Sequence, residues 1–126
     1  GQPLACWLAV SVSVCLCPES QLLLAGFSFG SAIVAAASER IAVAQMVLIA
    51  PPVTRYSYAP QGAFTCPTTL VFGGKDETVE EGGVRALLAT LERPVDTVFM
   101  PEACHFYHGQ LKTLREKIGS VLSQCL

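Results

Sequence analysis

The sequence has few charged residues and no cluster of basic ones. Charged side chains make up 14% of the 126 residues, and the formal net charge is −2. Proteins that bind nucleic acid or an anionic membrane surface carry patches of Lys and Arg, so we expect neither partner. The hydrophobic content of 52% is enough for a folded core, which argues against a disordered chain. At this length, one domain spanning residues 1–126 is the expectation.

No segment predicts a membrane span or a secretory signal. Leu4 to Leu16 is mostly apolar, but Pro18-Glu19 ends the run short of the ~20 residues that a spanning helix needs. No Lys or Arg precedes the run, as a secretory signal would require. We therefore interpret it as a buried helix or strand. Because the chain opens with Gly1 rather than Met, we expect a fragment or a processed product.

The sequence also lacks a Cys-x-x-Cys pair and the cysteine–histidine spacing that is typical of zinc ligands. Its six cysteines lie mostly in apolar or strand-like surroundings, where a free thiol behaves as a small hydrophobic group. These features predict reduced thiols, a cytoplasmic location and no bound metal.

Beyond this opening run, short apolar segments alternate with helix-length segments. The expected strands are residues 21–25, 45–50, 68–72 and 95–100, and the expected helices are residues 28–40, 84–92 and 110–122. The strands are almost continuously apolar, which is typical of parallel strands buried on both faces. The alternation therefore predicts an α/β fold with a parallel sheet between helices.

Two segments fit no single element. Residues 5–9 are compatible with a helix, whereas residues 10–14 alternate Val and Ser with a period of two, as a strand does. Residues 51–65 contain Tyr, Pro and Gly without a clear period. We interpret them as a long loop, which in a compact domain often borders a site.

The most informative motif is Gly26-Phe27-Ser28-Phe29-Gly30, between the first expected strand and an Ala-rich helix. A Gly-x-Ser-x-Gly turn in this setting holds a serine as a nucleophile. Glycines without a Cβ let the strand and the helix approach closely around the turn. Because such a turn also occurs as an ordinary glycine-rich loop, the rest of the chain must decide between the two.

Two more reactive residues follow later strands in the chain order Ser, Asp, His. Asp76 follows the third expected strand and His105 the fourth. The carboxyl ends of parallel strands meet at one edge of a sheet, so we expect these side chains to lie near Ser28. A neutral imidazole takes the serine proton, and a carboxylate orients the imidazole. The backbone N–H of Phe29 would donate to the developing oxyanion.

Each assignment has an alternative. Glu77 stands beside the expected aspartate and could serve instead, whereas Asp96 lies within a strand and is expected at the surface. His108 competes with His105 but better suits a supporting or surface role. Cys104 has neither a preceding glycine nor a strand–helix turn, so we expect a packed thiol rather than a nucleophile.

Several motifs together resemble the small, lidless α/β-hydrolases of the dienelactone-hydrolase-like group. They are Gly26-Phe27-Ser28-Phe29-Gly30, Leu48-Ile49-Ala50-Pro51-Pro52-Val53, Cys66-Pro67, Gly73-Gly74-Lys75-Asp76-Glu77 and His105-Phe106-Tyr107-His108-Gly109. The resemblance runs from about Leu22 to the C-terminus. It implies Ser28 as nucleophile, Asp76 as acid and His105 as base. The implied function is a serine hydrolase of esterase type that cleaves an ester or similar acyl bond of a small molecule, without a cofactor.

The same resemblance predicts that part of the fold is missing. The family has further strands before the one that leads to the serine, and one loop among them gives a second oxyanion donor. We expect room for none of these strands, with residues 1–17 corresponding to the helix that precedes the serine strand. The prediction is a partial α/β-hydrolase fold of about four mostly parallel strands, with a bare strand edge through which the chain self-associates. The alternative function is a non-catalytic, truncated hydrolase-like chain with an interaction or structural role.

Overall fold

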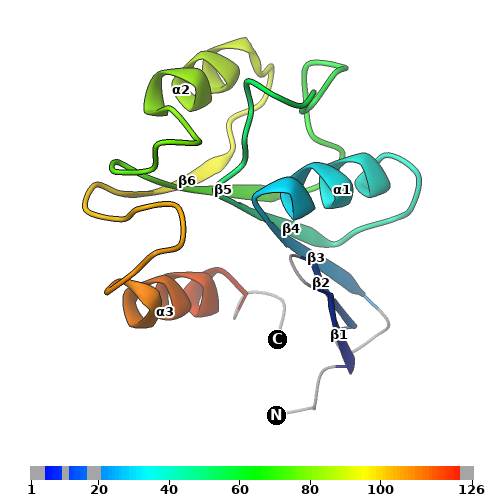
Figure 1. Ribbon diagram of the computed structural model, residues 1–126. Helices are drawn as coiled ribbons and strands as arrows, with labels where there is room; N and C mark the ends of the chain where they lie inside the picture. Colours follow the sequence, from blue (N-terminus) through cyan, green and yellow to red (C-terminus); the bar gives the residue numbers. More distant parts are fainter. Residues whose placement is uncertain (1–4, 10–11, 17–20, 123–126) are drawn as a thin grey trace.

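The computed structural model describes residues 5–9, 12–16 and 21–122, with side chains described over residues 21–120. Within these residues, six strands form one sheet in sequential order, and three helices lie against it (Figure 1). The strands are β1 (Ala5–Ala9), β2 (Val12–Leu16), β3 (Leu22–Phe27), β4 (Gln45–Ile49), β5 (Thr68–Gly73) and β6 (Asp96–Met100). The helices are α1 (Phe29–Ser38), α2 (Glu81–Thr90) and α3 (Leu111–Leu122).

Strands β3 to β6 are parallel, with helices on both faces of the sheet. The register pairs Leu24 with Met46, Leu48 with Leu70, and Val71 with Val98. Helices α1 and α2 cover one face, and α3 lies at the other (Figure 1). The predicted α/β fold with four parallel strands flanked by helices is confirmed. The element boundaries differ from the predicted ones by a few residues, most at the start of α2.

The helix that the resemblance implies for residues 1–17 is not found in the described part, residues 5–9 and 12–16, whereas the strand alternative is confirmed there. Instead of a helix before the serine strand, the chain forms β1 and β2, an antiparallel pair that extends the sheet. Alternating β-branched valines favour a strand in this segment. β2 pairs antiparallel with β3, so the serine strand has no bare edge and its backbone groups are satisfied. β1 and β2 therefore occupy the side of β3 that we expected to be bare.

The core is centred on β4 and β5, which are buried along nearly their whole length. Val34 and Ala35 of α1 pack against them from one face. Leu114 and Ile118 of α3 are partly buried against the same core. β6 is an edge strand, and Asp96 at its start is exposed, as predicted. The fold therefore holds the carboxyl ends of the parallel strands on a rigid, apolar base.

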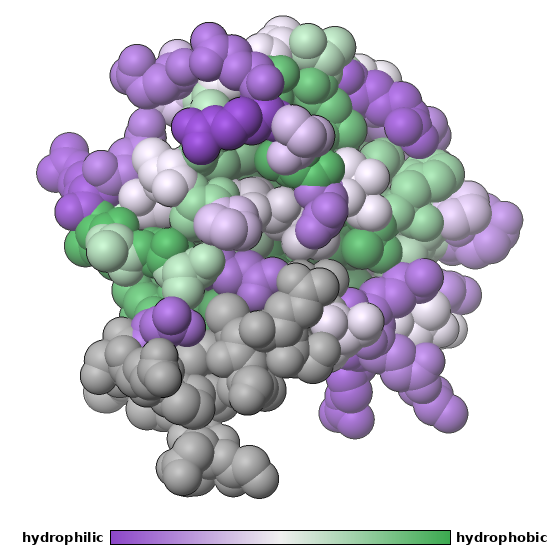
Figure 2. Space-filling view, turned by 180° about the vertical axis from the view of Figure 1, so that it is seen from behind, coloured by the Kyte–Doolittle hydropathy of each residue, from purple (hydrophilic) through white to green (hydrophobic). Residues whose placement is uncertain are grey.

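The outer surface is mixed in character. Seen from behind, hydrophilic residues dominate the rim of the molecule, and hydrophobic residues show between them (Figure 2). Among the described residues, no helix is long and apolar enough to cross a membrane.

Candidate active site

Ser28 occupies a sharp turn between β3 and α1. Its backbone has φ 55° and ψ −123°, a region that L-residues adopt only under strain. The Ser28 N–H donates to the Ile49 carbonyl at 2.8 Å. The Ser28 carbonyl accepts from the Ser31 N–H at 2.9 Å and from Ser31 Oγ at 2.6 Å. These bonds hold the strained residue from both sides.

The turn depends on a close approach between β3 and α1. A Cβ on Gly26 would overlap the backbone carbonyl of Gly30 and come within 2.7 Å of Ser31 Cα. Real Cβ atoms do not approach backbone that closely. Glycine at position 26 is therefore required for the strand and the helix to cross where they do.

A buried hydrogen-bond chain supports the turn from the loop that follows β4. The Tyr58 hydroxyl lies 2.6 Å from Ser31 Oγ, and Ser31 is fully buried. Burial raises the pKa of Tyr58 to about 12, so its phenol stays protonated and donates to Ser31. The Ser31 hydroxyl in turn donates to the Ser28 carbonyl. The segment predicted as a long loop thus braces the serine turn from behind.

The loops after β5 and β6 are joined through their backbones. The Gly74 N–H donates to the Met100 carbonyl, and the Lys75 N–H donates to the Ala103 carbonyl, both at 3.0 Å. A Cβ on Gly74 would come within 2.5 Å of the Pro101 carbonyl oxygen. This close fit places the segment with Asp76 directly beside the segment with His105.

The three predicted site residues lie together at the carboxyl edge of the sheet. His105 Nε2 is 3.0 Å from Ser28 Oγ, and His105 Nδ1 is 2.7 Å from Asp76 Oδ2. The Asp76 side chain is fully buried, and the His105 side chain is 15% exposed. The carboxylate can only accept, so we assign the imidazole proton to Nδ1. Nε2 is then free to accept the Ser28 hydroxyl proton.

Thr78 also belongs to this cluster, although the sequence pattern did not single it out. Its Oγ1 donates to Asp76 Oδ1 at 2.7 Å and lies 2.7 Å from His105 Nδ1. The same carboxylate oxygen accepts the N–H groups of Thr78 at 2.9 Å and Val79 at 3.1 Å. An aspartate side chain often accepts a hydrogen bond from the backbone N–H two residues on, and this turn pattern was the available signal for the Thr78 position.

The competing residues lie differently. Glu77 and His108 are both exposed. His105 is hydrogen-bonded to Ser28 rather than to Cys104. Cys104 is a free thiol, half-buried rather than packed as expected. Backbone hydrogen bonds, chiefly that of His108, lower the pKa of the Cys104 thiol. Among the described residues, no group of three or more His, Cys, Asp or Glu side chains is placed to hold a metal ion.

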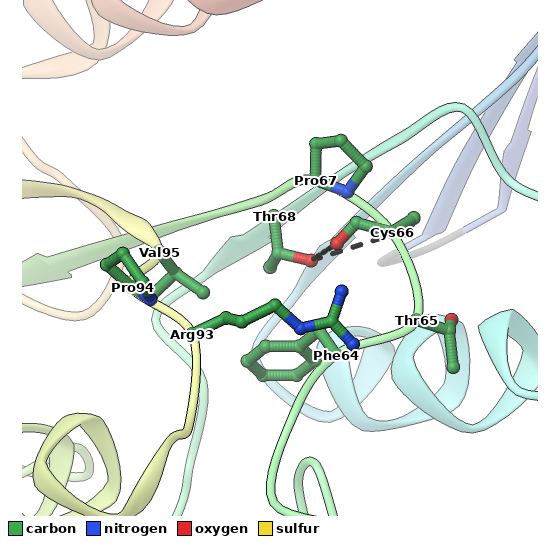
Figure 3. A pocket seen from close by; sticks show the side chains of 8 residues that line it. All are labelled: Phe64, Thr65, Cys66, Pro67, Thr68, Arg93, Pro94 and Val95. Atoms are coloured by element: carbon green, nitrogen blue, oxygen red, sulfur yellow. Dashed lines mark hydrogen bonds between the residues drawn. The ribbon is translucent and has the colours of Figure 1, made fainter.

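A hollow lies at the opposite edge of the sheet, near the amino ends of β5 and β6. Its volume is about 340 Å³, and Arg93 reaches across it (Figure 3). Its lining residues are Phe64, Thr65, Cys66, Pro67, Thr68, Arg93, Pro94 and Val95. Because Ser28, Asp76 and His105 follow the carboxyl ends of their strands, this hollow is separate from the serine cluster.

A parallel sheet with a serine turn after one strand, and acid and base after two others, defines the α/β-hydrolase class of architecture. Comparisons with solved structures agree. An α/β serine hydrolase homologue from Coxiella burnetii is 39% identical over 79% of this chain and 48% of that chain, with a TM-score of 0.74. A lidless α/β serine hydrolase from Xanthomonas campestris is 32% identical over 86% of this chain and 50% of that chain, with a TM-score of 0.78.

A more distant match supports the fold alone. The esterase domain of a Rhodothermus marinus protein is 16% identical over 81% of this chain and 60% of that chain, with a TM-score of 0.68. No protein-family model and no curated protein matches the sequence. The chain is thus related to the α/β-hydrolase superfamily, as its motifs predict, and spans about half the length of the first two structures.

Proposed function

We propose that this chain carries the nucleophile, base and acid of a serine hydrolase that cleaves an ester or similar acyl bond of a small molecule. The observation that supports it most is the pair of contacts made by His105, 3.0 Å to Ser28 Oγ and 2.7 Å to Asp76 Oδ2. A serine hydroxyl is a poor nucleophile until a base takes its proton. His105 is within reach to act as that base, and Asp76 is within reach to orient it.

In the proposed reaction, Ser28 Oγ attacks the carbonyl carbon while its proton passes to His105 Nε2. The carbonyl oxygen becomes an oxyanion, to which the Phe29 N–H at the start of α1 donates. The C–O bond to the leaving alcohol then breaks, and that alcohol takes the proton from Nε2. Water repeats the sequence on the acyl-serine and releases the acid. Asp76 stays ionised throughout and stabilises the imidazolium.

The supporting contacts act on His105 and Asp76. The Thr78 hydroxyl donates a hydrogen bond to Asp76 Oδ1, and its oxygen accepts one from the Nδ1–H of His105. We propose Thr78 as a positioning residue that favours the Nδ1–H tautomer. The free thiols Cys66 and Cys104 fit the proposed cytoplasmic setting.

The second candidate is a non-catalytic chain with an interaction or structural role. It is favoured by the coverage, since the chain spans 48% and 50% of the two solved relatives. A tetrahedral intermediate is normally stabilised by two donors, and loss of one costs about 10² to 10³ in rate. Phe29 supplies one of them. On this basis we expect the chain alone to be a weak catalyst.

Labelling with a fluorophosphonate separates the two candidates. A functional nucleophile is expected to react rapidly in the full chain and not at all in Ser28→Ala. The exposed Ser57 offers a matched control, because Ser57→Ala should label like the unmodified protein. Equal, slow labelling of the full chain and the Ser28→Ala variant would favour the non-catalytic role.

A further inference from the structure

Phe106 borders the imidazole of His105 and is one of the most exposed apolar side chains described. It is 61% exposed. Its ring centroid lies 5.1 Å from that of His105, with the two rings nearly perpendicular at 82°. Phe27, just before the serine, lies 5.1 Å from His105 and 5.9 Å from Phe106. The imidazole is therefore bordered by two aromatic rings.

The backbone around Phe106 keeps its ring at the surface. Tyr107 has φ 56°, a left-handed conformation that is strained for a bulky residue. Its side chain is 1% exposed, and its N–H donates to the Cys104 carbonyl at 3.0 Å. The turn thus buries Tyr107 and leaves the neighbouring Phe106 outside. Backbone strain that persists beside a reactive histidine is typical of functional segments.

Exposure alone would not single out Phe106, because Leu111 is 62% exposed and such side chains are common at surfaces. What distinguishes Phe106 is its contact with the base. In an ester cleavage at Ser28, the leaving alcohol takes its proton from His105 Nε2. The group attached to that alcohol oxygen must therefore lie next to the imidazole when the C–O bond breaks.

We propose that Phe106, backed by Phe27, binds the alcohol part of the ester, and that this part is aromatic or similarly flat and apolar. The inference rests on the proposed hydrolase function and names one half of its substrate. Aromatic rings gain from edge or offset contacts beyond their buried area, so a flat leaving group complements this surface better than a short alkyl one.

Benzyl acetate and ethyl acetate test the proposal, because they share an acyl group and both release a primary alcohol. The unmodified chain is expected to favour benzyl acetate in kcat/KM. Phe106→Ala should lower kcat/KM for benzyl acetate about fivefold to tenfold and leave ethyl acetate within about twofold. Phe106→Tyr should retain the preference. Leu111→Ala, a matched loss of an exposed apolar side chain, should leave both values unchanged.

A binding measurement keeps the inference separate from the function itself. In the Ser28→Ala variant, benzyl acetate but not ethyl acetate is expected to shift the NMR resonances of the Phe106 and His105 rings. An unchanged benzyl-to-ethyl ratio in Phe106→Ala, with both esters cleaved, would overturn the inference and leave the hydrolase function standing. If neither ester is cleaved, the proposed function fails for this chain. In that case, NMR shifts of the Phe106 and His105 rings with benzyl acetate would still support Phe106 as the binding surface. The absence of these shifts would overturn the inference as well.

Discussion

His105 Nε2 lies 3.0 Å from Ser28 Oγ, although the two residues are 77 positions apart in the chain. Two independent loops meet at this contact. One is the strained turn after β3, and the other is the segment after β6 that is hydrogen-bonded to the loop after β5. Because both loops rest on a buried parallel sheet, the distance is set by rigid elements rather than by a flexible chain end.

Replacement of the serine tests the chemistry directly. We expect Ser28→Ala to abolish cleavage of a short p-nitrophenyl ester, since loss of a triad serine typically costs on the order of 10⁴ to 10⁶ in kcat. Cys104→Ala should keep most of the activity, because the Cys104 thiol is not the group bonded to His105. Steady-state kinetics on both variants make the comparison. The reverse pattern, with activity lost only in Cys104→Ala, would show that Cys104 rather than Ser28 is the nucleophile.

Asp76 and Glu77 form a natural matched pair. Asp76→Asn keeps an oxygen that can accept the N–H bonds of Thr78 and Val79, so the fold should persist. The amide would donate to His105 Nδ1 and force the ring proton onto Nε2, the wrong tautomer. A fall of about 10⁴ in kcat is expected. Glu77→Gln, at an exposed position, should change kcat less than about twofold. Comparable losses in both variants would contradict the assignment of the acid.

Thr78→Val removes a hydroxyl with little change in shape. We expect kcat to fall about tenfold with KM unchanged, since hydrogen bonds to charged groups contribute about 1.5–3 kcal/mol and this one is partly exposed to water. The low-field proton NMR signal of His105 Nδ1–H should weaken as well. Thr78→Ser should restore both.

A purely structural role for Thr78 would give a different result. Thermal stability would then fall in Thr78→Val while the Nδ1–H signal and kcat stayed as in the unmodified chain. Thr97→Val, at an exposed position in β6, is the control for a general threonine-to-valine effect.

The close approach at Gly26 predicts opposite outcomes for two glycine substitutions. Gly26→Ala places a Cβ against the backbone of Gly30, and such overpacking costs about 1–3 kcal/mol or more. Gly119 lies within α3, and a Cβ added there would meet open space, with no atom beyond the helix's own backbone within 4 Å. Gly119→Ala should therefore stabilise the chain, by up to about 1 kcal/mol. Urea unfolding of both variants measures the difference, and a stable Gly26→Ala protein would show that the turn can widen.

Alkaline pH should weaken the fold through Tyr58. Burial raises the folded pKa of Tyr58 from 10.0 to about 12, so the unfolded chain loses this proton first. The stability contribution is fully present below pH 10 and is lost as the pH rises toward 12, with a slope of up to ~1.4 kcal/mol per pH unit. Tyr58→Phe should show a shallower loss in urea titrations over this range. Identical slopes would mean that Tyr58 ionises without unfolding the chain. Burial raises the pKa of Tyr107 as well, which accounts for a residual slope.

Much of the parallel half of the fold can be predicted from the sequence. Continuous apolar runs such as Met46-Val47-Leu48-Ile49 are typical of strands buried on both faces, and the structure buries them. Gly26 marks a place where backbones cross closely, as its position before the serine predicted, and the structure leaves no room for a Cβ there. Local chemistry and burial specify these features, so a short stretch of chain is enough to predict them.

The antiparallel half was decided by tertiary pairing. A helix and a strand were both compatible with the first residues, and the family resemblance favoured the helix. Instead, β2 fills the unpaired side of β3, because the backbone N–H and C=O groups of a buried strand need partners that local sequence does not reveal.

The candidate site also has features that the sequence predicts and features that only the structure shows. The proximity of Ser28, Asp76 and His105 was predicted from the sequence alone, because each follows a strand and the carboxyl ends of parallel strands meet. The contacts of Thr78 and the exposed ring of Phe106 beside His105 were not, because they depend on distances between loops that are far apart in the chain. The sequence by itself determined which residue types reach the carboxyl edge. Only the folded chain decided which of them touch, since packing of the sheet sets the separations between its loops.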